Sequence, residues 1–412
     1  MGALDGLRVL DLSRVLAGPY CTQMLADHGA EVIKVESPAG DETRGWGPPF
    51  LSEGTSAYYA NLNRGKKNIV LDLSGPDGRS LLGTLLAGAD VVVENFKAGT
   101  LARWGWPDET IRAEYPALIH CRITGFGTDG PLGGLPGYDA VLQAYGGLMS
   151  VNGEADGPPL RIGVPVVDVV TGVLGFSGIL LALHERARSG LGQLVDCSLL
   201  DTVISLLHPH SAAWLADGAV PRRTGSAHPS IAPYETFSTA DGLFFVGAGN
   251  DRQFAALVDV LGAPGLASDP RFASNADRVA NVGALRAELS VLIGQYKRDS
   301  LAELLLAKGV PASPVHDIAE AMNAPQVRHR EMVVERDGYR GVGVPVKLGR
   351  TPGCAAESPR SPGADTREVL AAAGLSREEV ERALAKGAAH SELAKGAAHS
   401  ERAKGVADGG RS

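Results

Sequence analysis

The sequence predicts an α/β fold, with a Rossmann-like large domain built on a doubly wound parallel sheet and a smaller α+β domain. Two observations predict it. Over the first 130 residues, short runs rich in Val, Ile and Leu alternate with runs of helical pattern, which is typical of parallel strands joined by crossover helices. Later, a connector rich in Pro, Ser and Gly at residues 216–235 precedes a second set of strands and helices.

The elements of the large domain can be placed one by one from these patterns. Helices are expected at Pro19–His28, where Pro19 suits a first helical turn, at Ser80–Leu86, at about Thr171–Arg188 and at Leu199–Leu215. Strands are expected at Leu7–Leu12, Glu31–Glu36, Asn68–Leu73, Asp90–Glu94, Leu118–Ile123 and Gln193–Cys197.

The smaller domain should contain a strand, three helices and an edge strand. These are expected at Gly242–Val246, Gln253–Leu261, Ala284–Gln295 and Leu301–Lys308, with Gly309–Val315 as the loop into the edge strand. The β pattern then returns at about Val334 and ends at Gly343–Lys347, followed by helices at Thr366–Ala373 and Arg377–Leu384.

The C-terminal region contains a duplication. The sequence LAKGAAHSE occurs at residues 384–392 and again at 393–401. Such low complexity indicates a disordered tail over residues 383–412; a terminal interaction helix is the alternative.

The composition disfavours several classes of protein. A net charge of −8 argues against nucleic acid as a partner, which calls for a basic surface. The four cysteines lie far apart without a CxxC pair, so a reduced, cytoplasmic protein is expected. Charges at Asp5, Arg8 and Asp11 argue against a signal peptide. The longest apolar stretch, Val169–Leu183, is too short to span a bilayer, so no membrane partner is expected.

Common cofactor motifs are missing or misplaced. The GxGxxG at Gly125–Gly130 runs into Pro131 rather than into a helix, and neither a P-loop motif nor a GxSxG elbow before a helix occurs. Dinucleotide enzymes, P-loop enzymes and serine hydrolases are therefore disfavoured. His208 and His210 lack a third ligand at suitable spacing, so no metal site is expected.

Asp168 is an isolated carboxylate in the apolar run VPVVDVVTG, at the start of an expected helix. In one interpretation it caps that helix or occupies its first turn. If Thr171 is the cap instead, Asp168 stays free, the helix N-terminus keeps it ionised, and its apolar neighbours limit its hydration. Those conditions favour a nucleophile.

Basic residues occur near the ends of predicted strands, in the runs Arg64–Lys67 and Asn95–Lys97 and at Arg103. Ligands bind at strand ends in doubly wound sheets. Together these cations would suit a phosphorylated, adenine-containing ligand; solvated surface charges are the alternative.

Several segments together resemble the family III CoA-transferases, which include formyl-CoA transferase, carnitine CoA-transferase and α-methylacyl-CoA racemase. The resemblance runs from about residue 4 to about residue 382. It is carried by LDGLRVLDLSRVLAGPYCTQMLADHGAEVIKVESPAGDETRGW, NRGKK with the following IVLDL, ADVVVENFKAGTLARWG, ITGFGTDGPLGGLPGYD, RSGLGQLVDCSLLD, DPRFASNADRVAN and KGVPASPV.

The resemblance implies an interlocked homodimer, in which each chain threads through a ring formed by its partner. It also implies a division of the chain. Residues 1–215 would form the N-terminal part of the large domain, 216–235 a linker, 236–325 the small domain, 326–382 the C-terminal part that returns to the large domain, and 383–412 the tail.

The reaction implied by the resemblance moves CoA between an acyl-CoA and a carboxylic acid. Asp168 would be the nucleophile, with an acyl-aspartyl anhydride and an aspartyl-CoA thioester as intermediates. CoA enters as part of the substrate, and the resemblance implies neither a permanently bound cofactor nor a metal.

The resemblance also implies binding positions. Those that match CoA-binding residues of the family are Leu16, Ala17, Leu71, Asp72, Leu73, Ser74, Asn95, Phe96, Lys97, Arg103, Leu135, Pro136, Gly137 and Tyr138. The loop Gly247, Ala248, Gly249 and Asn250 replaces a longer glycine loop of formyl-CoA transferase and should shape the acyl pocket. Ser37 stands where the family has a basic residue, and Gly363–Thr366 lacks the family's histidine.

Two alternative functions stay open. The racemase branch has a histidine before an aspartate where this sequence has Tyr138 before Asp139. Tyrosine, with an ordinary pKa of about 10, is a poor base at neutral pH, so transfer is favoured over racemisation. A CoA-binding protein without activity is the second alternative.

Overall fold

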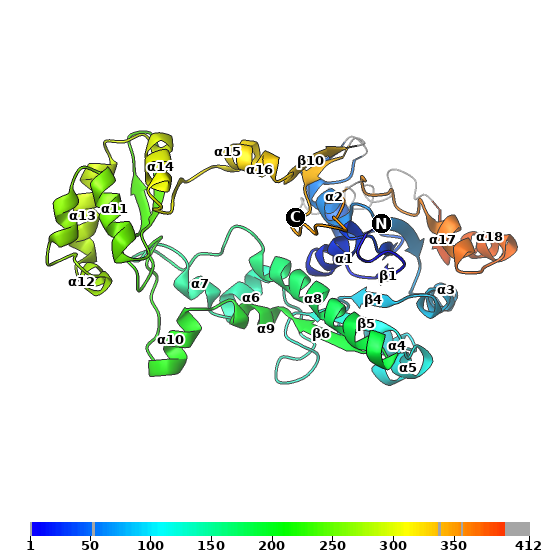
Figure 1. The fold of residues 1–412 in the computed structure, drawn as a ribbon. Coiled ribbons are helices and arrows are strands. Elements are labelled where there is room, and N and C mark those ends of the chain that lie inside the picture. Colours follow the sequence, from blue (N-terminus) through cyan, green and yellow to red (C-terminus); the bar gives the residue numbers. More distant parts are fainter. Residues whose placement is uncertain (1, 52–53, 337–338, 356, 392–412) are drawn as a thin grey trace, which may run out of the picture. The chain divides into compact units, whose positions relative to one another are not determined.

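The computed structural model describes residues 2–51, 54–336, 339–355 and 357–391. The chain forms two compact units (Figure 1). The larger unit comprises the described parts of Met1–Gly146, Gly163–Leu207 and Gln326–Ser412, and the smaller unit comprises Gly147–Ile162 and His208–Pro325.

The larger unit is built on a seven-stranded sheet in the order β12-β3-β2-β1-β4-β5-β6. Strands β1 to β6 are mutually parallel, and β12 joins the edge antiparallel to β3. The strand order reverses between β1 and β4, and in such doubly wound sheets ligands bind at the carboxyl ends beside this switch point. The predicted parallel α/β architecture is confirmed. The strands are β1 (Arg8–Asp11), β2 (Glu31–Glu36), β3 (Lys67–Leu71), β4 (Val91–Glu94), β5 (Ile119–Thr124), β6 (Leu194–Ser198) and β12 (Ala389–His390).

Helices lie on both faces of this sheet. The helices of this unit are α1 (Ala17–Asp27), α2 (Ala57–Asn63), α3 (Pro76–Ala87), α4 (Thr100–Arg103), α5 (Asp108–Glu114), α6 (Asp139–Tyr145), α8 (Val166–Ser189), α9 (Leu199–Ser205), α16 (Pro325–His329), α17 (Thr366–Ala372) and α18 (Arg377–Ala385), with a 3-10 turn at Glu42–Gly45. Helix α3 lies on one face of the sheet, and α1 and α8 lie on the other. The hairpin β10 (Val333–Arg336) and β11 (Tyr339–Val342) completes the unit.

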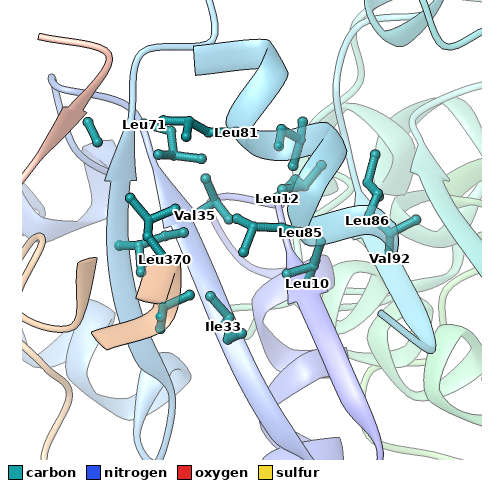
Figure 2. Close-up of a cluster of buried hydrophobic side chains, with 14 of the residues drawn as sticks. Leu10, Leu12, Ile33, Val35, Leu71, Leu81, Leu85, Leu86, Val92 and Leu370 are labelled. Atoms are coloured by element: carbon teal, nitrogen blue, oxygen red, sulfur yellow. The ribbon is translucent and has the colours of Figure 1, made fainter. Parts of the chain in front are cut away.

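One face of the sheet packs against α3, as Figure 2 shows. Leu81, Leu85 and Leu86 of α3 meet Leu10 and Ile33 of the strands, and all five side chains are buried. Burying one such side chain stabilises the fold by about 1.5–3 kcal/mol. The β-branched composition of the strands and the leucine spacing of α3 therefore account for this part of the core.

The other face is covered by α1 and α8, which approach each other closely. A Cβ built on Gly172 of α8 would lie 2.7 Å from the carbonyl oxygen of Ala17 in α1. Any larger residue at position 172 would therefore push the two helices apart. This contact fixes the first turn of α8 beside the loop that follows β1.

Helix α8 is longer than the sequence predicted, because it begins at Val166 rather than at about Thr171. Thr171 does not cap it; its hydroxyl donates to the Val167 carbonyl at 2.7 Å, inside the helix. By length and composition, α8 is the one helix among the described residues that could cross a membrane. This is weak evidence, since core helices pass the same test, and α8 packs against α1, α9, β5 and β6.

The smaller unit contains a three-stranded antiparallel sheet in the order β7-β8-β9. Phe237, Phe244, Phe254 and Phe272 lie at the centre of its core. Its elements are α7 (Leu148–Val151), α10 (His210–Asp217), β7 (Tyr234–Ser238), β8 (Leu243–Gly247), α11 (Asp251–Val260), a 3-10 turn (Pro264–Ser268), α12 (Asn275–Ala280), α13 (Val282–Ile293), α14 (Arg298–Ala307), β9 (Ala312–Pro314) and α15 (Ile318–Asn323).

Three local predictions were wrong. The expected helix Leu199–Leu215 is two helices, α9 and α10, separated around Pro209, which cannot continue a helical hydrogen-bond ladder. Strand β7 begins inside the predicted connector. The segment Gly343–Lys347, which contains a proline, is not a strand; the strand before it, β11, ends at Val342.

The division of the chain differs from the sequence-based one in two places. Residues 208–215, expected in the large domain, and the expected linker 216–235 belong to the smaller unit. Residues 147–162, also expected in the large domain, belong to the smaller unit as well. Arg223 explains this placement, because its guanidinium donates to the Gly157 carbonyl at 2.6 Å and to the Glu154 carbonyl at 3.3 Å. The contact joins residues more than sixty positions apart in the sequence, so no local pattern could show it.

Residues 384–391 of the first repeat copy are part of the fold, which corrects the predicted start of the tail at residue 383. Helix α18 extends to Ala385, and Ala389 of β12 pairs with Leu71 of β3. Ala388 and Ala389 are 6% and 1% exposed. Small apolar side chains suit this narrow position in the core. The second copy, residues 393–401, and the rest of the predicted tail or terminal helix lie outside the described residues.

Candidate active site

The loops after β1 and β4 meet at the switch point of the sheet. The Arg14 N–H donates to Asn95 Oδ1 at 3.0 Å, and Asn95 Nδ2 donates to the Arg14 carbonyl at 2.8 Å. This reciprocal pairing holds the loop that carries Leu16 and Ala17 against the segment Asn95–Lys97.

The other matched positions lie at the carboxyl ends of β3 and β5. Leu71 ends β3 and residues 72–74 follow it, and Leu135–Tyr138 lies between β5 and α6. A Cβ built on Gly134 would lie 3.2 Å from the Cβ of Ala98, so the second of these loops reaches the loop after β4. The fold therefore brings the matched positions to the carboxyl edge of the sheet, and their contact with CoA stays a prediction.

Exposure divides these positions into two groups. The side chains of Leu16, Ala17 and Leu71 are buried, whereas Tyr138 is 60% exposed. Lys97 and Arg103 are also exposed. The exposed members are the ones whose side chains can reach a large anionic ligand.

Asp168 lies in the first turn of α8, and the carboxylate of Asp139 caps that turn. Oδ2 of Asp139 accepts the backbone N–H of Val167 at 2.8 Å and that of Asp168 at 3.2 Å. Its Oδ1 accepts the Gln143 amide at 2.6 Å. Asp139 is 6% exposed. The free amides at the start of α8 are thus satisfied by a residue from α6, which leaves the side chain of Asp168 available.

The carboxyl of Asp168 has a pKa well above the ordinary value for aspartate. Burial and the nearby charge of Asp139 raise its pKa to about 7. Within the described residues, no hydrogen bond to the Asp168 carboxylate and no cation offsets these two effects. The sequence led us to expect that the helix N-terminus would keep Asp168 ionised; this was wrong, because Asp139 takes the amides that would have stabilised the charge.

Tyr58 on α2 lies close enough to Asp168 and Asp139 for their charges to affect its phenol. Burial, and after it the charges of Asp168 and Asp139, raise the pKa of its phenol. Its ring packs edge-on against Trp46, with centroids 5.3 Å apart. Tyr58 and Val169 also line a cavity of about 420 Å³ in the larger unit. A carboxylate, a neutral phenol and a largely apolar cavity therefore lie near one another.

The sequence of this chain matches the family described as CoA-transferase family III over residues 4–366. The chain belongs to this family. A succinate–glutarate CoA-transferase from Agrobacterium fabrum is 44% identical over 85% of this chain and 90% of its own. An acetyl-CoA:oxalate CoA-transferase from Acetobacter aceti is 41% identical over 84% and 89% of the two chains. A succinyl-CoA:mesaconate CoA-transferase from Haloarcula marismortui is 42% identical over 82% and 86%.

Solved structures agree with this assignment. The crystal structure of a CAIB/BAIF family protein from Brucella suis superposes with a TM-score of 0.83 and is 43% identical, over 90% of this chain and 99% of that one. A hypothetical protein from Mycobacterium tuberculosis has a TM-score of 0.80 and 30% identity, over the same shares. This CoA-transferase therefore shares its fold with CAIB/BAIF proteins.

The cations of the basic run Arg64–Lys67 are held in ion pairs around the start of β3. Arg64 bonds Asp27 at 2.7 Å and Lys66 bonds Asp11 at 2.9 Å, with all four side chains buried. The prediction that this run contacts a phosphorylated ligand was wrong, because these cations are needed to neutralise buried carboxylates.

The loop Gly247–Asn250 lies in the smaller unit, between β8 and α11. Ala248 is fully buried. Asn250 caps α11, its Oδ1 accepting the Gln253 N–H at 3.0 Å, and the Gly249 N–H donates to Gln253 Oε1 at 2.9 Å. These contacts give the loop a defined shape within its own unit. Its part in an acyl pocket stays a prediction.

The departures from the family pattern have local roles. Ser37 is exposed, and its hydroxyl is 3.4 Å from the Gly40 carbonyl. In Gly363–Thr366, the Gly363 N–H donates to Asn68 Oδ1 at 2.8 Å and the Thr366 hydroxyl to the His390 carbonyl at 2.8 Å. This segment therefore braces β3. No group of three potential metal ligands occurs within the described part of the chain.

Sequence reasoning missed two residues of the site. Asp139 appeared only as part of the Tyr138–Asp139 pair, and Tyr58 was not singled out. The position of Asp139 at the start of a helix, directly after an exposed glycine-rich loop, is a signal that could have found it. Tyr58 gives no such signal, since it resembles any aromatic on an amphipathic helix.

Proposed function

We propose that this CoA-transferase moves CoA from a donor acyl-CoA to a carboxylic acid through covalent intermediates on Asp168. The single observation that carries the proposal is the environment of this carboxyl. It is half-buried at the carboxyl edge of a doubly wound sheet, and its oxygens are left free by the capping of α8 by Asp139. A poorly solvated carboxylate is a stronger nucleophile than a hydrated one.

In the first half-reaction, an oxygen of ionised Asp168 attacks the thioester carbonyl. The carbon–sulfur bond breaks, giving an acyl-aspartyl anhydride and CoA thiolate. The thiolate then attacks the Asp168 carbonyl carbon and releases the donor acid as its carboxylate. An aspartyl-CoA thioester remains.

The second half-reaction reverses these steps with the acceptor acid. Its carboxylate attacks the Asp168 carbonyl carbon, releases CoA thiolate and forms a new anhydride. Attack of the thiolate on the acceptor's acyl carbon yields the product acyl-CoA and restores the Asp168 carboxylate. No net proton is consumed, so the residues need only hold the reactants in line and exclude water from the anhydride.

The names of the relatives suggest one class of substrate. Succinate, glutarate, oxalate and mesaconate are short dicarboxylates, and an acid of this class is proposed as one of the two partners. CoA contacts are assigned to the loops after β1, β3, β4 and β5, with Lys97 and Arg103 pairing with phosphates. Trapping an Asp168 adduct with hydroxylamine in the presence of succinyl-CoA tests the mechanism.

One observation favours a second candidate. A carboxyl with a pKa of about 7 is suited to moving a proton at neutral pH, as racemisation at C2 of a branched acyl-CoA would need. Deuterium from heavy water would then appear at C2 during incubation with 2-methylacyl-CoA. Retention of the C2 proton in the presence of a measurable CoA exchange dismisses this candidate.

A homodimer is proposed as the working form, with each chain threaded through its partner. Apolar side chains of α8 support it, since Val173, Leu174 and Leu181 are 38%, 42% and 72% exposed. Such side chains usually mark a contact surface. Light scattering at micromolar concentration should give twice the chain mass; Leu181→Glu should shift the mass towards that of one chain.

A further inference from the structure

The cavity beside the nucleophile runs along one face of α1. Leu16, Tyr20 and Met24 are spaced four residues apart and line it, with Asp27 at the far end. Residues at this spacing lie on one side of a helix. Since α1 has 11 residues and a helix rises about 1.5 Å per residue, the cavity follows a helix about 15 Å long.

One end of the cavity is next to the proposed active site. Leu16 belongs to the loop after β1, Val169 follows Asp168 directly in the chain, and Tyr58 is near enough to Asp168 for its charge to raise the pKa of the phenol. The other end is formed by the Asp27–Arg64 ion pair and by Val342 and Pro345 after β11. All these residues belong to the larger unit.

The polar groups at the far end are already satisfied. Arg64 is the only residue with a cationic side chain among the described residues that line the cavity. Its guanidinium donates twice to Asp27, at 2.9 and 2.7 Å, and also to the Val342 carbonyl and the Tyr339 hydroxyl. A carboxylate entering this end would meet Asp27 and would lose its water without gaining a free cation.

We propose that this cavity holds the acyl chain of one substrate, and that this chain is an unbranched apolar one from a monocarboxylic acid. The inference rests on the proposed function and extends it. The second partner, a short dicarboxylate, reacts at Asp168 without entering the far end. The walls contributed by Leu16, Met24 and Val169 are apolar and suit methylene groups.

Binding of unreactive CoA thioethers tests this proposal without requiring transfer. Calorimetry with the full chain compares CoA, S-propyl-CoA, S-hexyl-CoA and S-(5-carboxypentyl)-CoA. Each buried methylene should tighten binding by roughly threefold. S-hexyl-CoA should therefore bind at least about tenfold tighter than S-propyl-CoA, and the carboxylated chain should bind no tighter than S-propyl-CoA.

A matched pair of variants locates the effect. Ala57→Leu adds bulk to the cavity beside Tyr58, whereas Ala372→Leu adds the same bulk to a second cavity at the amino ends of the strands. Ala57→Leu should abolish the preference for the hexyl chain and leave the affinity for CoA unchanged. Ala372→Leu should change neither. Thermal unfolding of both variants checks that they fold.

Equal affinity for the propyl and hexyl thioethers overturns the proposal, as does tighter binding of the carboxylated chain or a hexyl preference that survives Ala57→Leu. If these results accompany a trapped adduct on Asp168, only the cavity assignment is lost. If no CoA thioether binds at all, the proposed function is overturned together with the inference.

Discussion

Asp139, the first residue of α6, caps α8, in whose first turn Asp168 lies. The carboxylate of Asp139 accepts the backbone N–H of Asp168 at 3.2 Å and that of Val167 at 2.8 Å, and its charge helps to raise the pKa of the Asp168 carboxyl to about 7. Asp139 therefore holds the backbone at Asp168 and disfavours ionisation of the Asp168 carboxyl.

Replacing Asp139 by Asn should move the pH dependence of CoA transfer to lower pH. Transfer needs ionised Asp168, so activity in the native enzyme should rise as pH passes through about 7. Asn keeps an oxygen that can cap α8 but removes the charge that opposes ionisation. The check is kcat/KM for acyl-CoA between pH 5 and 9. An unchanged profile in Asp139→Asn would show that Asp139 does not tune the nucleophile.

Asp168→Asn should abolish transfer and stabilise the fold at alkaline pH. The folded-state pKa of about 7 lies above the ordinary value of 3.8, so between these values the folded state binds more protons than the unfolded one. The free energy of unfolding therefore falls as pH rises through this window. We compare the free energy of unfolding of the variant with that of the native protein. Allowing for partial solvent screening, this difference should favour the variant by about 2 kcal/mol more at pH 8 than at pH 4. Denaturant unfolding measures this, with Asp156→Asn, an exposed acid, as the control. If Asp168→Asn changes the free energy of unfolding equally at pH 4 and pH 8, the Asp168 carboxyl does not have a raised pKa.

Lys66→Met should destabilise the fold strongly. The ammonium of Lys66 bonds Asp11 at 2.9 Å, and removing it strands a fully buried carboxylate. Breaking such a pair costs about 3–5 kcal/mol. Lys67→Met is the matched control, because its ion pairs with Glu31 and Glu368 are partly exposed and contribute about 1 kcal/mol or less. Similar losses in the two variants would contradict the assigned difference in burial.

Deleting residues 393–412 should leave the unfolding temperature unchanged, whereas deleting residues 384–412 should lower it. The shorter deletion keeps β12, whose Ala389 pairs with Leu71 of β3 and is 1% exposed. The longer one removes that strand and the end of α18, exposing the edge of the sheet. Calorimetry on the two truncated chains checks this. A loss of stability from the shorter deletion would assign the second repeat copy a part in the fold.

The sequence predicted the parallel α/β sheet because its strands are buried on both faces and read as runs of Val, Ile and Leu. It also indicated Asp168, because a lone carboxylate in an apolar run is conspicuous. It could not show that Asp139 would take the amides at the start of α8, since the two residues are 29 positions apart. The prediction that Arg64 and Lys66 contact a phosphorylated ligand failed for a related reason. In the sequence, a basic run that faces solvent cannot be distinguished from one that neutralises buried carboxylates, as these residues do with Asp27 and Asp11.

The prediction of a disordered tail from residue 383 also failed, because it was based on low-complexity composition. The first repeat copy has the low complexity of a tail, yet Ala388 and Ala389 fit the core because they are small. Burial of that kind depends on the neighbouring elements β3 and α17, which are far from Ala388 and Ala389 in the chain or are placed beside them only by folding. A short stretch of sequence therefore cannot show it.

The proposed transfer depends most directly on acylation of Asp168. The full chain is incubated with succinyl-CoA, quenched with hydroxylamine, digested and analysed by mass spectrometry. We expect a hydroxamate on the peptide that contains Asp168, absent without succinyl-CoA and absent in Asp168→Asn. Turnover of succinyl-CoA with that peptide unmodified, or an adduct on another residue, contradicts it.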